Sequence, residues 1–348
     1  MPFVVQAQVA VPVAKVAKVE TPGPDSEERR EMTRVQILLD RANYRPGKID
    51  GLGGEFTQKA ADRYLAASGM EPGTRLDTAQ IPEPYTTHTV TEEDLQWIGK
   101  TAGTPPEQAK LKRMPYADPW ELLAEMFHCD LNFMKELNPG VVAEDLVAGA
   151  TVCVPDVPPF RMADVQALEK KRAGDAKARK LAAAASPTPE ESGEAGLPGA
   201  SPTPTPEPTP APLNHRLVLL REPRLIEVYD AGDRMIACFP CTPGSSSIPV
   251  PAGTWKVTSN ILMPYFRWDK SVLQSGVPSA VAYNIPPGPN NYVGIVWMGI
   301  NRRSVGMHGT NNPDQIGRNQ SSGCIRLANW DAFLLTQLVE KGTPVEVR

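Results

Sequence analysis

Apolar and β-branched residues alternate with polar ones through residues 213–348, and Gly, Pro and Asn interrupt the runs. This period of two predicts half-buried β-strands. One helical pattern comes late, where Asn329 can cap a helix, Asp331 suits its first turn and Gly342 ends it. Residues 213–348 therefore predict a mostly β domain with one helix. The expected strands read RLVLL, RLIEVYD, MIACF, GTWKVTS, AVAYNI, YVGIVWMGI, SVGMHG and PVEVR.

A helical unit is expected at 27–82. Val35, Leu38 and Leu39 recur at helical spacing, a second helical pattern runs from Phe56 to Leu65, and a glycine-rich turn, YRPGKIDGLGG, lies between them. The pattern resembles the three-helix peptidoglycan-binding module, with a generic helical hairpin as the alternative. The resemblance rests on Pro46-Gly47, Ile49-Asp50-Gly51, Gly54, Thr57 and Ala60.

Residues 84–157 predict a second unit with the order strand, helix, helix, strand. Its segments read PYTTHTVTEEDL, PWELLAEMFHCD, LNFMKELNPG and LVAGATVCVPD. This βααβ order, with L-N-P between the halves and a closing G-x-x-V-x-V-P, resembles a LysM glycan-binding module. The first connection is longer here than is usual in that family.

Two segments lack the pattern of a core. Residues 158–212 begin as a charged, alanine-rich helix and end in a stretch with nine prolines, 186–212. Polyproline II stiffens such a stretch, which can hold its ends up to roughly 80 Å apart, so we expect a spacer. Residues 1–26 are expected to be disordered. They lack the basic start of a signal peptide, and the remnant of a longer export signal is the alternative.

Composition narrows the function. The net charge of −4 argues against a nucleic-acid partner, which would require a basic face. No apolar run approaches the ~18 residues of a membrane span, so no integral membrane segment is expected. Neutral or zwitterionic substrates stay open. The sequence implies no metal and no cofactor.

Five cysteines leave at least one thiol without an intramolecular partner. Cys238 and Cys241 form C-F-P-C, but no second CxxC completes a zinc site, and the pair lies in a strand-like run. Ordinary strand cysteines are therefore favoured over a redox or metal pair. Cys129 and Cys153 fall at apolar positions, where buried thiols or a disulfide are both open. Cys324 lies in a polar segment, NQSSGCIRLANW.

A thiol nucleophile needs a nearby base. Four histidines are present. His88 and His128 belong to the upstream units and His215 lies at the edge of the linker. By elimination, His308 in VGMHGTNNP, sixteen residues before Cys324, is the well-placed imidazole.

The residues around this pair suit acyl transfer. Gly309 and Gly323 let the backbone approach a substrate carbonyl, so that amides can bind an oxyanion. Arg326 adds a cation that favours thiolate or holds a substrate carboxylate. The plainer interpretations are a structural histidine, a small buried cysteine and an arginine paired with an acid.

The ordered segments M-H-G-T, I-G and S-S-G-C-I-R-L resemble the L,D-transpeptidase catalytic domain, the YkuD-like family. IPVPAGTWKVTS and residues 285–291 extend the resemblance over 213–348. It implies Cys324 as nucleophile and His308 as general base, with the Gly309 carbonyl orienting the imidazole. Amides at Gly323 and Cys324 would form the oxyanion hole. Arg326 would contact a stem-peptide carboxylate.

One residue departs from the family pattern. Many members read S-H-G-C, and here Ser322 replaces that histidine, so His308 must serve alone. Ser322 is grouped with Arg326 as a candidate substrate contact.

The implied reaction is attack on a peptidoglycan stem tetrapeptide, formation of a cysteine acyl-enzyme, and 3→3 crosslinking. Resolution by water, which gives a carboxypeptidase or amidase, and a non-catalytic wall-binding scaffold are the alternatives. The partner implied is peptidoglycan, and the place implied is the cell envelope, periplasmic or wall-associated, although no export signal is evident. The oligomeric state stays open.

Overall fold

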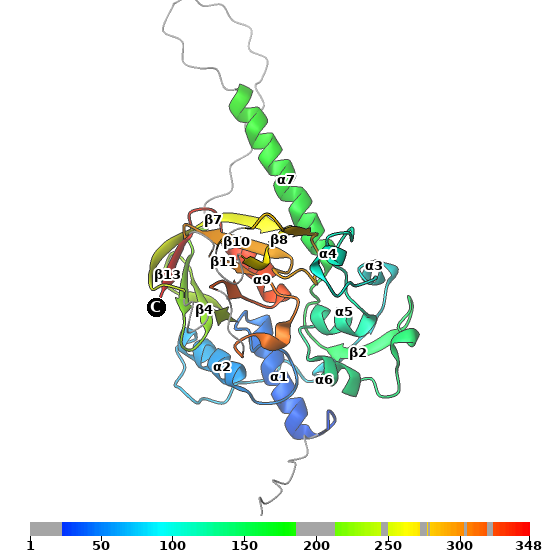
Figure 1. Ribbon diagram of the computed structural model, residues 1–348. Helices are drawn as coiled ribbons and strands as arrows, with labels where there is room; N and C mark the ends of the chain where they lie inside the picture. The colour runs from blue at the N-terminus through cyan, green and yellow to red at the C-terminus, as the bar shows by residue number, and fades with distance from the viewer. Residues whose placement is uncertain are drawn as a thin grey trace, which may run out of the picture.

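The computed structural model describes residues 23–185, 213–244, 250–271, 277, 279–302, 305–318 and 323–348, with side chains up to residue 178 in the first range. Residues 1–22, the Pro-rich segment and Ser322 lie outside these ranges. Figure 1 shows a β-rich body with the two N-terminal units packed beside and below it. Within the described ranges, no helix is long and apolar enough to cross a lipid bilayer.

The first unit contains two helices, α1 (Glu27–Arg41) and α2 (Glu55–Ala67), so the expected three-helix module is wrong in its helix count. After α2, a stretch rich in Gly and Pro (68–84) forms no helix. Gln36 on α1 holds the glycine-rich turn between the helices. Its Oε1 accepts from the backbone amides of Asp50 (3.1 Å) and Gly51 (2.9 Å).

The second unit has the expected order of strand, helix, helix, strand. β1 (Tyr85–Thr89) pairs antiparallel with β2 (Thr151–Pro155), and the N-cap carboxylates Asp118 and Asp130 start the two helices between them. Two short helices and a 3-10 turn were not expected. The helices of this unit are α3 (Glu92–Leu95), α4 (Pro105–Gln108), α5 (Pro119–Met126) and α6 (Leu131–Glu136), with η1 at Ala143–Asp145.

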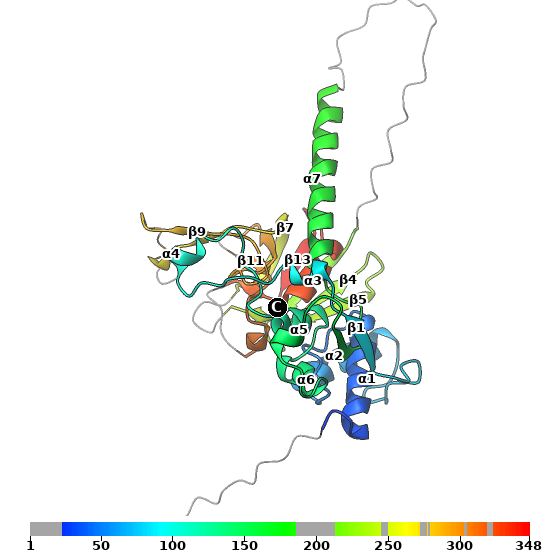
Figure 2. The ribbon, with the colours of Figure 1, turned by 90° about the vertical axis from the view of Figure 1, so that its right-hand side faces the viewer.

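The charged, alanine-rich segment forms α7 (Met162–Ala185), whose far end projects from the body in Figures 1 and 2. Its near half packs on the β domain. Arg172 donates to the Thr336 carbonyl (2.6 Å), and the rings of Phe160 and Phe333 lie 5.7 Å apart. The helix is therefore anchored at one end.

A nine-stranded sheet forms the C-terminal domain, in the order β5-β4-β3-β13-β7-β10-β11-β12-β6. β3 runs parallel to β13 and β11 runs parallel to β12, whereas the other neighbours are antiparallel. A separate hairpin pairs β8 with β9. The bounds are β3 (Arg216–Leu220), β4 (Leu225–Tyr229), β5 (Met235–Pro240), β6 (Thr242–Pro243), β7 (Gly253–Leu262), β8 (Phe266–Trp268), β9 (Tyr283–Ile285), β10 (Val296–Ile300), β11 (Gly306–His308), η2 (Pro313–Gln315), β12 (Ile325–Arg326), α9 (Asn329–Leu338) and β13 (Pro344–Val347).

The late helix, α9, differs from its sequence prediction at both ends. Ala328 occupies the N-cap position without a side-chain cap, and the helix ends at Leu338, well before Gly342. The expected capping by Asn329 is therefore wrong. Its side chain is used for tertiary contacts instead.

Both N-terminal units pack directly on the β domain. The Tyr44 hydroxyl donates to the Met235 carbonyl (2.8 Å), and the His128 ring stacks on Trp330 at 5.4 Å. Buried Arg45 lies between Asp40 of α1 (2.5 Å) and a carboxylate of α9. The N-terminal units therefore contact the β domain directly through buried polar and aromatic groups, whereas the expected spacer, 186–212, lies outside the described residues.

The cysteines outside the candidate site are thiols. Cys129 is buried and Cys153 is half-buried, so the thiol alternative holds for this pair. Cys238 and Cys241 are fully buried, and burial raises the pKa of both. Buried thiols of this kind are unreactive.

Candidate active site

His308 is the last residue of β11, a short buried strand between β10 and β12. Its Nδ1 lies 2.6 Å from the Gly309 carbonyl, which can only accept, so Nδ1 carries the proton and Nε2 is the basic nitrogen. The ring stacks on Trp297 of β10 at 5.5 Å. Burial lowers the pKa of His308 to about 4; the Gly309 bond opposes this and the Arg326 charge adds to it. The imidazole is therefore neutral at pH 7.

Cys324 lies directly before β12. In the parallel register His308 is opposite Arg326, so two residues earlier Cys324 lies beside Gly306. Because alternate residues of a strand share a face, the side chains of His308, Arg326 and Cys324 lie on one face of the sheet. The structure thus brings together residues that are sixteen positions apart.

The surroundings of the Cys324 thiol have opposing effects on its pKa. Burial raises its pKa, while a hydrogen bond from the Gly306 amide and the charge of Arg326 lower it. The side chain is half-buried, so it is not sealed in the core. Because the imidazole is neutral at pH 7 and burial favours the protonated thiol, the two groups rest as thiol and imidazole rather than as a thiolate–imidazolium ion pair.

Arg326 is also half-buried, and burial lowers its pKa. Among the residues that the structure describes, no carboxylate forms an ion pair with it, in contrast to the plain interpretation of an arginine neutralised by an acid. Its guanidinium is available to an anionic ligand beside Cys324.

Gly323 and Gly309 have different structural reasons to be glycine. Gly323 has φ +96°, a conformation that other residues rarely adopt, directly before the thiol. A Cβ at Gly309 would lie 2.2 Å from Asn329 Oδ1. The predicted role of the Gly309 carbonyl fits the observed bond to His308. Ser322 is outside the described residues.

Asn329, which we expected to cap the late helix, lies against Gly309 and makes tertiary contacts. Its Oδ1 accepts from the Ile295 amide (3.3 Å), and its Nδ2 donates to the Pro289 carbonyl (3.1 Å) and to Glu125 Oε1 (3.0 Å). Asparagine at the start of a helix gives the same sequence signal whether it caps or not, so the pattern did not reveal this role.

The arrangement can perform nucleophilic acyl transfer. A thiol, a neutral imidazole with a fixed tautomer, and a nearby guanidinium share one face. The described residues contain no group of three or more His, Cys, Asp and Glu side chains placed to hold a metal ion.

Part of the chain is similar to known proteins. Residues 214–347 match the YkuD family, the L,D-transpeptidase catalytic domain. YkuD of Bacillus licheniformis, which bears the name of an L,D-transpeptidase, is 27% identical over 133 residues, 38% of this chain and 65% of that protein. Bacillus subtilis YkuD is 42% identical over 62 residues, 18% of this chain and 36% of that protein. The chain spans less than two thirds of the length of the curated relatives it matches.

Solved structures of L,D-transpeptidases also align with the YkuD-like domain. One from Mycobacterium smegmatis has a TM-score of 0.32 and 19% identity, covering 39% of this chain and 58% of that chain. One from Enterococcus faecium has a TM-score of 0.30 and 22% identity, covering 40% of this chain and 51% of that chain.

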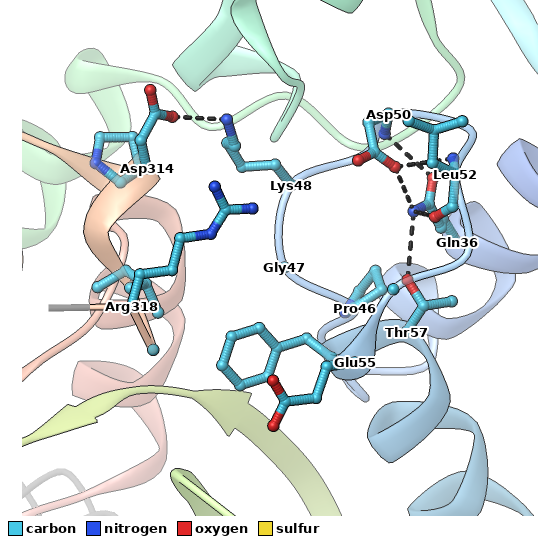
Figure 3. A pocket seen from close by; sticks show the side chains of 15 residues that line it. Gln36, Pro46, Gly47, Lys48, Asp50, Leu52, Glu55, Thr57, Asp314 and Arg318 are labelled. Carbon is cyan, nitrogen blue, oxygen red and sulfur yellow. Dashed lines mark hydrogen bonds and ion pairs between the residues drawn. The ribbon is translucent and has the colours of Figure 1, made fainter. Parts of the chain in front are cut away.

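A cavity of about 170 Å³ lies between the first N-terminal unit and the loop of the YkuD-like domain that leads towards Cys324 (Figure 3). Lys48 pairs with Asp314 across it at 2.5 Å, and Figure 3 shows Arg318 on the same side. At its edge the ring of Phe56 packs on Gly317. The first unit therefore contacts the segment that precedes the thiol.

Proposed function

We propose that the YkuD-like domain catalyses L,D-transpeptidation of peptidoglycan stem peptides, with Cys324 as nucleophile and His308 as general base. One observation carries the proposal. The Gly309 carbonyl holds Nδ1–H of His308, which leaves Nε2 basic on the face that also bears the thiol of the neighbouring strand. This arrangement supports a general-base role for His308 and a nucleophilic role for Cys324.

The first half-reaction forms an acyl-enzyme. As the sulfur attacks the carbonyl carbon between the L and D centres of the tetrapeptide, Nε2 of His308 takes the thiol proton. The C–S bond forms, and the C–N bond breaks as the imidazolium returns the proton to the leaving amine of D-alanine. Because the pKa of His308 is lowered and that of Cys324 is raised, proton transfer accompanies attack rather than preceding it.

Charge in the tetrahedral intermediate needs preorganised donors. Backbone amides at Gly323 and Cys324 are proposed as the oxyanion hole, where the positive φ of Gly323 turns the chain. Arg326 is proposed to bind a stem-peptide carboxylate. Ser322 stays a proposed substrate contact.

The second half-reaction transfers the acyl group. As the side-chain amine of a diamino acid on a second stem attacks the thioester carbonyl, His308 takes a proton from that amine. The C–N bond forms, the C–S bond breaks, and the imidazolium returns the proton to the sulfur. The product is a 3→3 crosslink, and no metal or cofactor takes part in these steps.

The N-terminal units are proposed to bind the same polymer. Their resemblance to peptidoglycan-binding and LysM modules supports this, and the direct packing on the catalytic domain would place bound glycan at a fixed position relative to Cys324. This substrate implies an envelope location outside the cytoplasmic membrane.

Mass spectrometry of products tests the reaction. We expect purified protein and disaccharide tetrapeptide to yield free D-alanine and a dimer, and the Cys324→Ala variant to yield neither. Tripeptide without dimer would contradict the transferase and favour water as the acceptor. No product from a folded wild-type protein would favour the scaffold.

A further inference from the structure

Glu125, on α5 of the second N-terminal unit, is a buried carboxyl group at the interface with the YkuD-like domain. It is 7% exposed, and its polar partners are neutral: the Tyr116 hydroxyl donates to Oε1 (2.7 Å), and Asn329 Nδ2 donates to the same oxygen (3.0 Å). Burial raises the pKa of Glu125 to about 8. Burying a carboxyl group without a cation beside it costs free energy. We therefore expect Glu125 to have a specific role at this position.

Asn329, the partner across the interface, fills a narrow space between two glycines of the catalytic domain. A Cβ at Gly294 would lie 2.0 Å from Asn329 Oδ1, and a Cβ at Gly309 would lie 2.2 Å from the same oxygen. Oδ1 also accepts from the Ile295 amide (3.3 Å). The carboxamide therefore packs directly against the backbone at Gly309 and accepts a hydrogen bond from the Ile295 amide.

Glu125 helps to hold this carboxamide in its observed orientation. A flipped amide would point its NH2 group at the Ile295 N–H, and would point its oxygen at the Pro289 carbonyl and at Glu125. The Ile295 N–H on one side and the Pro289 carbonyl on the other exclude that arrangement. Glu125 Oε1, which comes from a different unit of the chain, accepts a further hydrogen bond from Nδ2.

Gly309 is also the residue whose carbonyl holds His308 Nδ1 at 2.6 Å. A chain of contacts thus runs from α5 through the first residue of α9 to the imidazole. α5 and α9 lie against each other.

We propose that Glu125 is a positioning residue of the active site: it fixes Asn329, which fixes the Gly309 carbonyl and so the tautomer and orientation of His308. This rests on the proposed function for the meaning of His308 as a base. It gives the second N-terminal unit a part in catalysis in addition to glycan binding.

Three variants of the full chain test the proposal. Glu125→Ala removes an acceptor of Asn329 Nδ2. Glu125→Gln keeps an amide oxygen that accepts from Asn329 and Tyr116. Tyr116→Phe is the matched control, because it removes the other hydrogen bond to Glu125 and leaves the contact with Asn329 in place.

The first readout is single-turnover acylation of Cys324 by the tetrapeptide. For Glu125→Ala we expect the rate at saturating substrate to fall by about tenfold or more, since a general base contributes roughly 10²–10⁴-fold, with KM little changed. Glu125→Gln and Tyr116→Phe should stay close to the wild-type rate. If the acylation rate falls in all three variants in proportion to the fall in Tm, the effect is one of stability and the proposal is overturned.

The second readout needs no substrate. Nitrogen-15 NMR of the imidazole should show His308 as the Nδ1–H tautomer in the wild type, Glu125→Gln and Tyr116→Phe, and as a mixture of tautomers in Glu125→Ala. An unchanged tautomer in a folded Glu125→Ala protein would overturn the proposal even if the peptide assay succeeded. If the wild type has this tautomer but does not acylate, the proposed function fails while the positioning role stands.

Discussion

At the scale of single residues, the environment of His308 decides how the candidate site works. The ring is buried against Trp297, and this burial lowers the pKa of His308 to about 4, although the bond to the Gly309 carbonyl opposes the shift. The thiol of Cys324 is held protonated by its own burial. Both effects favour a general-base mechanism over a preformed ion pair.

The pH dependence of thiol acylation follows from these shifts. The imidazole must be neutral to act as a base. We therefore expect the acid limb of the pH–rate profile near pH 4, the pKa of His308, rather than near 6.5. Acylation rates measured at subsaturating substrate across this range, with circular dichroism at each pH to verify folding, provide the check. An acid limb centred at 6.5 would show that the imidazole is not buried as described.

At the scale of elements, close backbone contacts join α2 to the loop before the thiol. Gly317 has φ +73°, and a Cβ there would lie 2.2 Å from the tip of the Phe56 ring. The Gly317 amide also donates to Thr242 Oγ1 at 2.8 Å. The loop is therefore fitted to this helix.

Gly317→Ala should destabilise the protein by about 1–3 kcal/mol through overpacking and backbone strain. In a Phe56→Leu background the steric part should shrink, because the smaller side chain leaves room for the methyl group. Urea unfolding of the two single variants and the double variant measures the coupling. Strictly additive losses would mean that Phe56 and Gly317 are not in contact.

The elements differ in how far the sequence predicts them. The strands around Cys324 and His308 follow from alternation and turn residues, which are local signals. The contact between Asn329 and Glu125 joins residues 204 positions apart, and neither has a local pattern that reveals the other. Asparagine before a helix also suits a cap, so local reasoning favoured the wrong partner.

At the scale of the whole molecule, the first turn of α9 joins three parts of the chain. Asn329 contacts the second N-terminal unit through Glu125, and Asp331 lies 3.5 Å from Arg45 of the first unit. Burial raises the pKa of Asp331 to about 8; Arg45 opposes this and Asp40 adds to it. Composition carries no information on the buried contacts between these units. The proline-rich segment therefore suggested separate modules.

Stability should therefore depend on pH through this interface. Glu125 and Asp331 keep their protons to about pH 8 in the folded state and lose them near pH 4 when unfolded. Their contribution to the free energy of unfolding is therefore full below pH 4 and falls as the pH rises towards 8. Buried His128 and His308, whose pKa values are lowered, act in the opposite direction below pH 6.5. The net loss should appear between pH 6.5 and 8.

Urea unfolding at the two ends of this window measures the loss, up to about 1.4 kcal/mol per pH unit for each carboxyl. The double variant Glu125→Gln, Asp331→Asn cannot ionise at these positions, so its stability should be nearly constant there. The same slope in the wild type and the double variant would show that these carboxyls do not titrate at the interface.

The central claim is that the sulfur of Cys324 carries the acyl group. Intact-protein mass spectrometry after brief mixing with disaccharide tetrapeptide should show one adduct, equal to the substrate minus D-alanine. The adduct should map to Cys324, be absent in Cys324→Ala and form much more slowly in His308→Ala. Product formation by a Cys324→Ala protein at the wild-type rate would contradict the account.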